Sequence, residues 1–198
     1  MKRRIKTPEQ QLIAAIERNN LSKFYMLFAQ GINCNYVDKT GYSILMYAIA
    51  KANIPMVKFL MCQPNLNINY QTNHQYEEGF TALILATDIY LFGTHAQYNG
   101  DKRDDDEFCF DVELIVILLL MHSKIDLSIN DDNGRNIGNL AAQYKDIFKE
   151  ILDEDIQNII LRNNVNNILF LEKYGLVHPN IKKNNPALFK ASEWGLIV

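Results

Sequence analysis

The sequence predicts an all-α fold of stacked antiparallel helix pairs, because two motifs recur along the chain in a fixed order. The first motif starts with glycine and occupies residues 41–48, 79–86 and 134–141. The second joins a polar turn to an apolar helical stripe and a Gly or Asn stop, at residues 19–35, 53–69 and 163–175. Such recurrence is typical of a repeat architecture, in which each unit buries its apolar face against its neighbours.

The first motif combines a tight turn with the start of a helix. Glycine readily takes the positive φ that ends such a turn. Ser43 and Thr81 follow their glycines by two residues, where a hydroxyl can cap a new helix. Leu45 and Ala48 then lie three residues apart on one helical face, and the small alanine lets a neighbouring helix approach closely.

The order of turn, glycine, cap, first helix, second helix and Gly or Asn stop resembles the ankyrin repeat, which is about 33 residues long. The resemblance implies an ankyrin-repeat solenoid of helix pairs with short β-hairpin or turn fingers, as a single domain over residues 1–198. The expected parts are a first helix near 8–18, units at about 38–69, 73–128 and 131–153, a helix pair at 156–175 and a C-terminal half-repeat at 185–195.

The repeats depart from the family pattern. None carries the full Thr-Pro-Leu-His sequence: residues 43–46 read Ser-Ile-Leu-Met and residues 81–84 read Thr-Ala-Leu-Ile. Gly138 stands where leucine is expected, which should cost its helix about 1 kcal/mol. The third unit also holds an insertion at about 89–110 that contains the acidic block 104–107. Two interpretations of the insertion stay open, a solvated loop and a partner-specific contact.

The sequence offers no catalytic residues, no metal ligands and no cofactor motif. It lacks HExxH, CxxC, GxSxG and phosphate-binding glycine patterns, and its three cysteines are odd in number and far apart. The acidic block lacks the alternating ligands of a calcium loop. The alternative from another class is an enzyme that uses the insertion, with His95 and Cys109 beside the acidic block.

Charge and hydropathy exclude two classes of partner. The net charge is −3, without the clustered basic excess of a nucleic-acid-binding protein. The longest apolar run, residues 112–121, is far shorter than the roughly 20 residues that span a bilayer, so membrane insertion is not expected. A signal peptide is not evident, and a cytoplasmic protein is expected.

The resemblance implies that the chain binds another protein through its concave face and hairpin tips. The variable positions that correspond to such contacts are Lys39, Thr40, Tyr42, Lys51, His74, Gln75, Tyr76, Glu77, Phe80, Asp88, Asp132, Asn133, Arg135, Gln143 and Tyr144. Four aromatic residues of this set are predicted to be exposed anchors, because aromatic side chains supply much of the energy of protein interfaces: Tyr42, Tyr76, Phe80 and Tyr144.

The Asn-, Ile- and Lys-rich composition resembles ankyrin proteins of intracellular bacteria and large DNA viruses. That resemblance implies a host-directed effector, which would act in the host cytoplasm. An immunity or antitoxin protein in the cytoplasm of its producer is the alternative, and an adjacent toxin gene would favour it.

Overall fold

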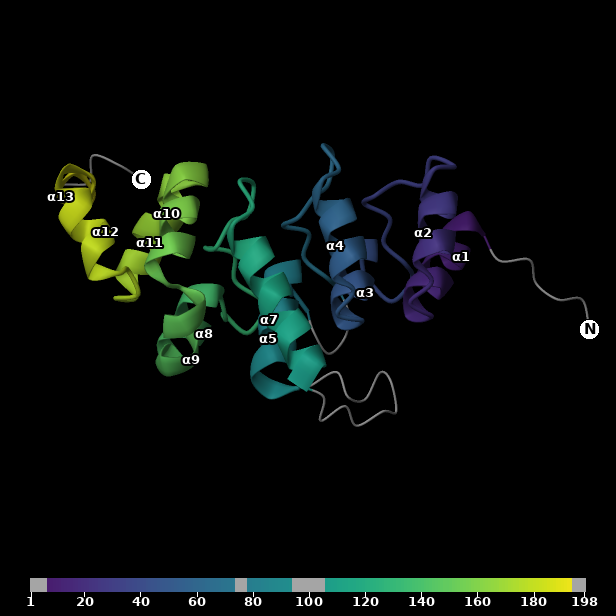
Figure 1. Cartoon of the computed structure of the whole chain (residues 1–198), viewed down its shortest axis with the longest axis horizontal. Helices are drawn as coiled ribbons and strands as arrows, with labels where there is room; N and C mark the ends of the chain where they lie inside the picture. Colours follow the sequence, from purple (N-terminus) through teal and green to yellow (C-terminus); the bar gives the residue numbers. More distant parts are fainter. Residues whose placement is uncertain (1–6, 74–77, 94–105, 194–198) are drawn as a thin grey trace, which may run out of the picture. The chain divides into compact units, whose positions relative to one another are not determined.

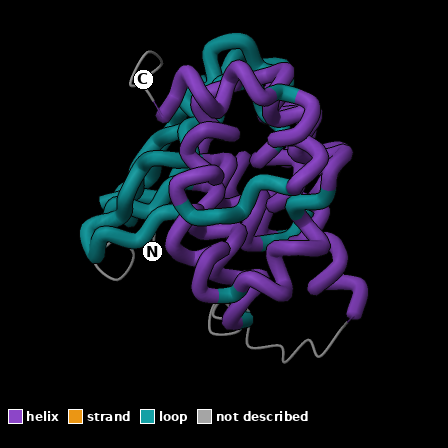
Figure 2. The backbone as a smooth tube through the Cα atoms, turned by 90° about the vertical axis from the view of Figure 1, so that its left-hand side faces the viewer, coloured by secondary structure: helices purple, strands orange, loops and turns teal. Residues whose placement is uncertain are grey.

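The computed structural model describes residues 7–73, 78–93 and 106–193, and every regular element in these ranges is a helix (Figures 1 and 2). An isolated antiparallel bridge joins Val37 to Ser43 in the first finger. The chain divides into two compact units, Met1–Ile115 and Val116–Val198, and helix α7 (Asp106–Leu120) contains the point of division. The single domain expected over 1–198 stays a prediction.

The first unit contains helices α1 (Pro8–Glu17), α2 (Leu21–Phe28), α3 (Ile44–Ala50), α4 (Ile54–Met61) and α5 (Ala82–Phe92). Helices α1 and α2 form one pair and α3 and α4 the next. Across pairs, α3 packs against α1 and α5, and α2 packs against α4. Every residue of α3 is buried, so this helix is the centre of the core.

The predicted turns and caps are confirmed. Gly41, Gly79 and Gly134 have φ values of 89°, 77° and 73°, a region in which other residues are strained. The Ser43 hydroxyl accepts a hydrogen bond from Met46 N, and the Thr81 hydroxyl accepts one from Ile84 N, each at 3.2 Å. The short motif therefore fixes the start of α3 and of α5 locally.

The second unit contains α8 (Ile137–Gln143), α9 (Lys145–Ile151), α10 (Glu154–Asn163), α11 (Val165–Lys173), α12 (Pro179–Asn184) and α13 (Pro186–Glu193). The predicted helix pair at 156–175 corresponds to α10 and α11. Helix α12 was not predicted; it starts at Pro179 after His178, whose side chain caps it. The end of the predicted half-repeat, residues 194 and 195, lies outside the described residues.

Asparagine side chains join neighbouring turns within the first unit. Asn53 caps α4 and donates its amide N–H to Oδ1 of Asn19, which occupies the equivalent turn of the preceding helix pair. Asn35 donates to the Asn65 carbonyl at 2.6 Å and accepts from Asn67 N at 2.7 Å. A neutral amide both donates and accepts, so one side chain can satisfy two backbone groups of the next turn.

The same device recurs in the second unit. Asn164 and Asn167 both donate to the carbonyl of Ile125, at 3.2 and 2.9 Å. The buried Asn167 also accepts from Leu127 N at 3.3 Å. The asparagines of this chain are thus partly structural, since they satisfy backbone groups between successive helix pairs.

Candidate functional site

The finger turn that precedes α3 is organised by the carboxylate of Asp38. Its Oδ1 accepts hydrogen bonds from Thr40 N at 2.9 Å, Thr40 Oγ1 at 2.5 Å and Tyr42 N at 3.2 Å. The Tyr47 hydroxyl donates to Oδ2 at 3.0 Å. One carboxylate therefore fixes the turn from inside, while the Lys39 side chain at its tip stays exposed.

The next finger anchors this turn from one side. The Tyr70 hydroxyl donates to the Gly41 carbonyl at 3.0 Å, and the Thr72 hydroxyl donates to the same oxygen at 2.9 Å. Burial raises the pKa of the Tyr70 phenol above its ordinary value, and the negative charge of Asp38 raises it further. The folded turn therefore favours the neutral phenol, which is the form that donates.

Tyr70→Phe should lower the free energy of unfolding by about 0.5–1.5 kcal/mol at pH 7, because it removes the hydrogen bond to Gly41. A raised folded-state pKa gives stability that is fully present below the unfolded value of about 10 and is lost as the pH rises above it. Urea unfolding at pH 7, 9, 10 and 11 should therefore show a shallower alkaline decline in Tyr70→Phe than in wild type. Tyr36→Phe is the matched control, and an equal decline in wild type and Tyr70→Phe would contradict this account.

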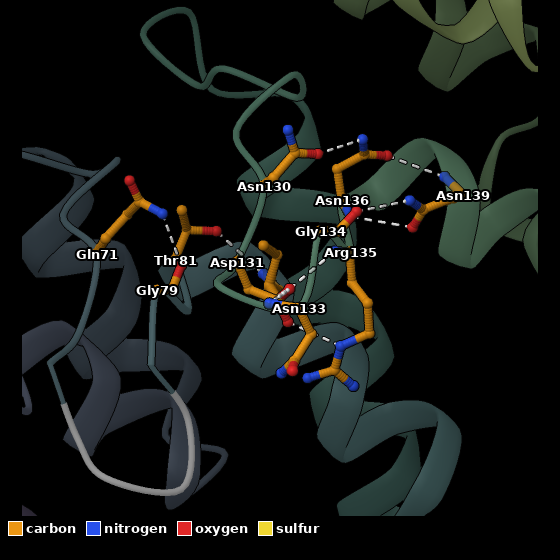
Figure 3. A network of polar contacts seen from close by, with 11 residues as sticks. Gln71, Gly79, Thr81, Asn130, Asp131, Asn133, Gly134, Arg135, Asn136 and Asn139 are labelled. Carbon is orange, nitrogen blue, oxygen red and sulfur yellow. Dashed lines mark hydrogen bonds and ion pairs between the residues drawn. The ribbon is translucent and has the colours of Figure 1, made fainter.

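A second carboxylate organises the finger turn that precedes α8 (Figure 3). Asp131 Oδ1 accepts from Asn133 N at 2.9 Å and from Arg135 N at 2.7 Å, and Oδ2 pairs with Arg135 Nε at 2.7 Å. The Asp131 side chain is fully buried, whereas that of Arg135 is 35% exposed. Asp38 and Asp131 each lie three residues before the motif glycine, a signal in the sequence that the motif alignment did not use.

Asn136 continues this network into α8. Asn136 and Asn139 form a reciprocal capping box, with both hydrogen bonds at 2.9 Å. The Asn136 amide also donates to Asn130 Oδ1 at 2.7 Å and to the Tyr174 hydroxyl at 3.2 Å (Figure 3 shows the first of these). The backbone of this finger is therefore fixed on both sides of Gly134.

The predicted contact residues differ in what their side chains do. Four are exposed: Lys39, Asp132, Asn133 and Gln143. Another four are partly buried: Thr40, Lys51, Arg135 and Tyr144. The side chains of Thr40 and Arg135 donate hydrogen bonds to the carboxylates of Asp38 and Asp131, so both residues also stabilise the finger turns.

Three predicted contact residues are buried, so the expectation that Tyr42 and Phe80 are exposed is wrong. Tyr42 and Phe80 are each 3% exposed, and Asp88 is 8% exposed. Tyr42 and Phe80 follow the motif glycine directly, at a position that points inward, and the Tyr42 ring lies 5.7 Å from that of Tyr47. These two rings stabilise the base of the finger and are not available as anchors.

Other predicted positions lie outside the described residues. They are His74, Gln75, Tyr76 and Glu77 of the finger that precedes α5, and residues 94–105 of the insertion, which include His95. The described flanks of the insertion are helical: α5 ends at Phe92 and α7 starts at Asp106. Cys109, in the first turns of α7, is exposed.

An exposed aromatic cluster on α2 and α4 was not predicted as a surface feature. Tyr25 and Met26 of α2 are 38% and 56% exposed. The rings of Tyr25 and Phe28 each meet that of Phe59 edge to face, at 5.1 and 5.0 Å. Phe28 and Phe59 are themselves only partly buried.

The described residues also bear on metal and membrane binding. In these parts of the chain, His, Cys, Asp and Glu side chains nowhere gather in threes that could hold a metal ion. Nor does any helix there combine the length and the apolarity needed to cross a membrane.

Comparison with known proteins supports the repeat assignment. A family model described as ankyrin repeats (3 copies) matches residues 12–89, which run from within α1 to within α5. No curated protein matches the sequence. The predicted fold class, all-α with ankyrin repeats, is therefore confirmed.

Proposed function

We propose that this chain is a protein-interaction module whose finger turns bind partner proteins, the turn around Lys39 in the unit Met1–Ile115 and, by itself, the turn around Asp132 and Asn133 in the unit Val116–Val198. Ankyrin repeats generally serve protein–protein interaction, and the family match at residues 12–89 supports that role here. The observation that carries the proposal is that different residues of each finger hold the turn and face solvent. Carboxylates at Asp38 and Asp131 hold the backbone, which leaves the tip side chains without a structural task.

A turn that is fixed before binding favours affinity, because less conformational freedom is lost when the partner docks. Lys39 presents a positive charge in the first unit, whereas Asp132 presents a negative charge in the second. Asn133 adds an amide that can donate and accept. The finger around Lys39 therefore suits an acidic partner surface, and the finger around Asp132 and Asn133 suits a basic one.

The test compares partners captured by the full chain and by the variant Lys39→Glu/Asp132→Lys/Asn133→Ala, which leaves the net charge unchanged. Each captured partner is then purified and its dissociation constant measured against both proteins. We expect the variant to bind at least tenfold more weakly, a loss of about 1.4 kcal/mol or more. The matched control is Lys58→Glu/Glu150→Lys, which swaps two exposed charges on α4 and α9.

Far-UV circular dichroism establishes that all three proteins are folded. Equal affinity of the finger variant and wild type would show that the partner binds elsewhere. A loss of the same size in the control would show that the effect is one of general charge placement.

We further propose that the partner is a host protein and that the chain is a host-directed effector. The support is compositional, since the Asn-, Ile- and Lys-rich sequence resembles ankyrin proteins of intracellular bacteria and large DNA viruses. Capture is run in parallel from host and producer lysates. If the finger-dependent partner is found only in the producer, the immunity or antitoxin alternative is correct.

A further inference from the structure

We propose a second binding site in the unit Val116–Val198, a pocket that takes one bulky apolar side chain of a partner segment flanked by carboxylates. The pocket lies where α9 and α10 meet residues 175–179 and has a volume of about 240 Å³. It shares no residue with the finger turns, and the proposal does not depend on them.

The walls of the pocket are apolar. Phe148 and Leu152 of the α9 region face Leu176 and Val177 of the segment after α11, and Pro179 completes the lining. Phe148, Leu152 and Val177 are buried, with 0%, 4% and 7% of their surfaces exposed, so the accessible apolar lining comes from Leu176, which is partly buried, and Pro179, which is exposed. A single leucine or phenylalanine side chain fits in a space of this size, since a cavity of about 150 Å³ already holds a benzene ring.

A buried amide holds the walls in place. Gln157 is 1% exposed and donates to the carbonyls of Leu152 at 2.7 Å and Leu176 at 3.1 Å. Its Oε1 accepts from His178 N at 2.8 Å. One side chain therefore ties the end of α9 to the segment after α11, and the pocket exists before any ligand arrives.

Two lysines of α9 line the pocket and place positive charge beside it. Lys145 and Lys149 both line it, and they lie four residues apart on one face of α9. Like charges at this spacing repel each other. Among the described residues, no carboxylate lies within ion-pair distance of either ammonium group, whereas Lys182 pairs with Glu172 and His178 faces Glu154 at 3.6 Å.

These observations select the occupant. Apolar walls favour a bulky apolar side chain, and two unneutralised ammonium groups beside it favour carboxylates on the residues around that side chain. A basic segment would add to the repulsion already present between these lysines. The site therefore fits an acidic peptide segment with one leucine or phenylalanine.

The experiment selects a displayed library of random 12-residue peptides against the full chain. We expect the enriched peptides to share a bulky apolar residue with two or more nearby Asp or Glu residues. Their affinity, measured by fluorescence anisotropy, should fall at least tenfold for Lys145→Glu/Lys149→Glu. It should fall equally when the apolar residue of the peptide is replaced by glycine.

Two controls isolate the pocket. Lys173→Glu/Lys183→Glu changes the net charge by the same amount at exposed positions of the same unit that do not line the pocket, and it should bind like wild type. The finger variant described above should also bind these peptides like wild type, so this proposal and the finger proposal fail separately.

Three outcomes would overturn the pocket proposal: enriched peptides without an acidic and apolar consensus, unchanged affinity in Lys145→Glu/Lys149→Glu, or an equal loss in the control variant.

Discussion

Gln157→Met is expected to lower the free energy of unfolding by about 2–4 kcal/mol. Methionine has nearly the shape of glutamine, so the change removes three hydrogen bonds with little change in packing. The carbonyls of Leu152 and Leu176 and the N–H of His178 lose their partner in buried or partly buried surroundings. A buried polar group left without a partner costs about 1–3 kcal/mol. Water can hydrate the more accessible of these groups, so the total loss is smaller than the sum of three such costs.

Urea unfolding followed by far-UV circular dichroism measures this loss. Hydrogen exchange then reports whether it is concentrated in residues 145–181, as the contacts of Gln157 require. The neighbouring variant Asn158→Met is the matched control, and its free energy of unfolding should stay within about 0.5 kcal/mol of wild type. A Gln157→Met protein as stable as its control would show that water replaces the amide at no cost.

Gly138→Ala is expected to lower the free energy of unfolding by about 1–2 kcal/mol, although helix propensity alone predicts a gain of about 1 kcal/mol. A Cβ atom at this position would lie 2.5 Å from Tyr174 Cδ2 and 2.9 Å from Phe170 Cε1, well inside van der Waals contact. To make room, the Tyr174 ring must leave its hydrogen bond with Asn136 and its packing on Phe170. Overpacking of this kind typically costs about 1–3 kcal/mol.

A double-mutant cycle tests the cause. Tyr174→Leu removes the ring edge that meets the new methyl group, so Gly138→Ala should cost less in that background than in wild type. Equal costs in both backgrounds would show that the two positions are not in steric conflict. A gain in stability for Gly138→Ala alone would mean that propensity outweighs packing here.

The parts of the fold that were predicted from sequence are those that local chemistry decides. Positive φ at Gly41 and Gly79 and the caps at Ser43 and Thr81 follow from residue types at fixed spacing, and the structure confirms them. Helix α12 was missed because it is six residues long, too short for an apolar period to emerge.

The remaining features depend on contacts between segments that are distant in sequence. Gly138 was interpreted as a weakness of its helix, but Tyr174 lies against it from 36 residues further along the chain. Tyr42 and Phe80 are likewise buried by packing against other segments, and the spacing of residues within a motif does not predict that packing. The pocket beside α9 joins residues 145–149 to 175–179, and that proximity exists only in the folded chain.

The asparagine bridges between neighbouring turns have a consequence for how the repeats stay aligned. Salt screens interactions between charged groups. Because an amide carries no net charge, salt should weaken these hydrogen bonds very little. The chemistry is exacting in another respect. Asn53, Asn164 and Asn167 each point an N–H group at an oxygen, so the nearly isosteric aspartate would replace a donor with an anion facing an acceptor. The alignment of neighbouring repeats should therefore be insensitive to ionic strength. It depends instead on the side-chain amide nitrogen of the asparagine at each of these contacts.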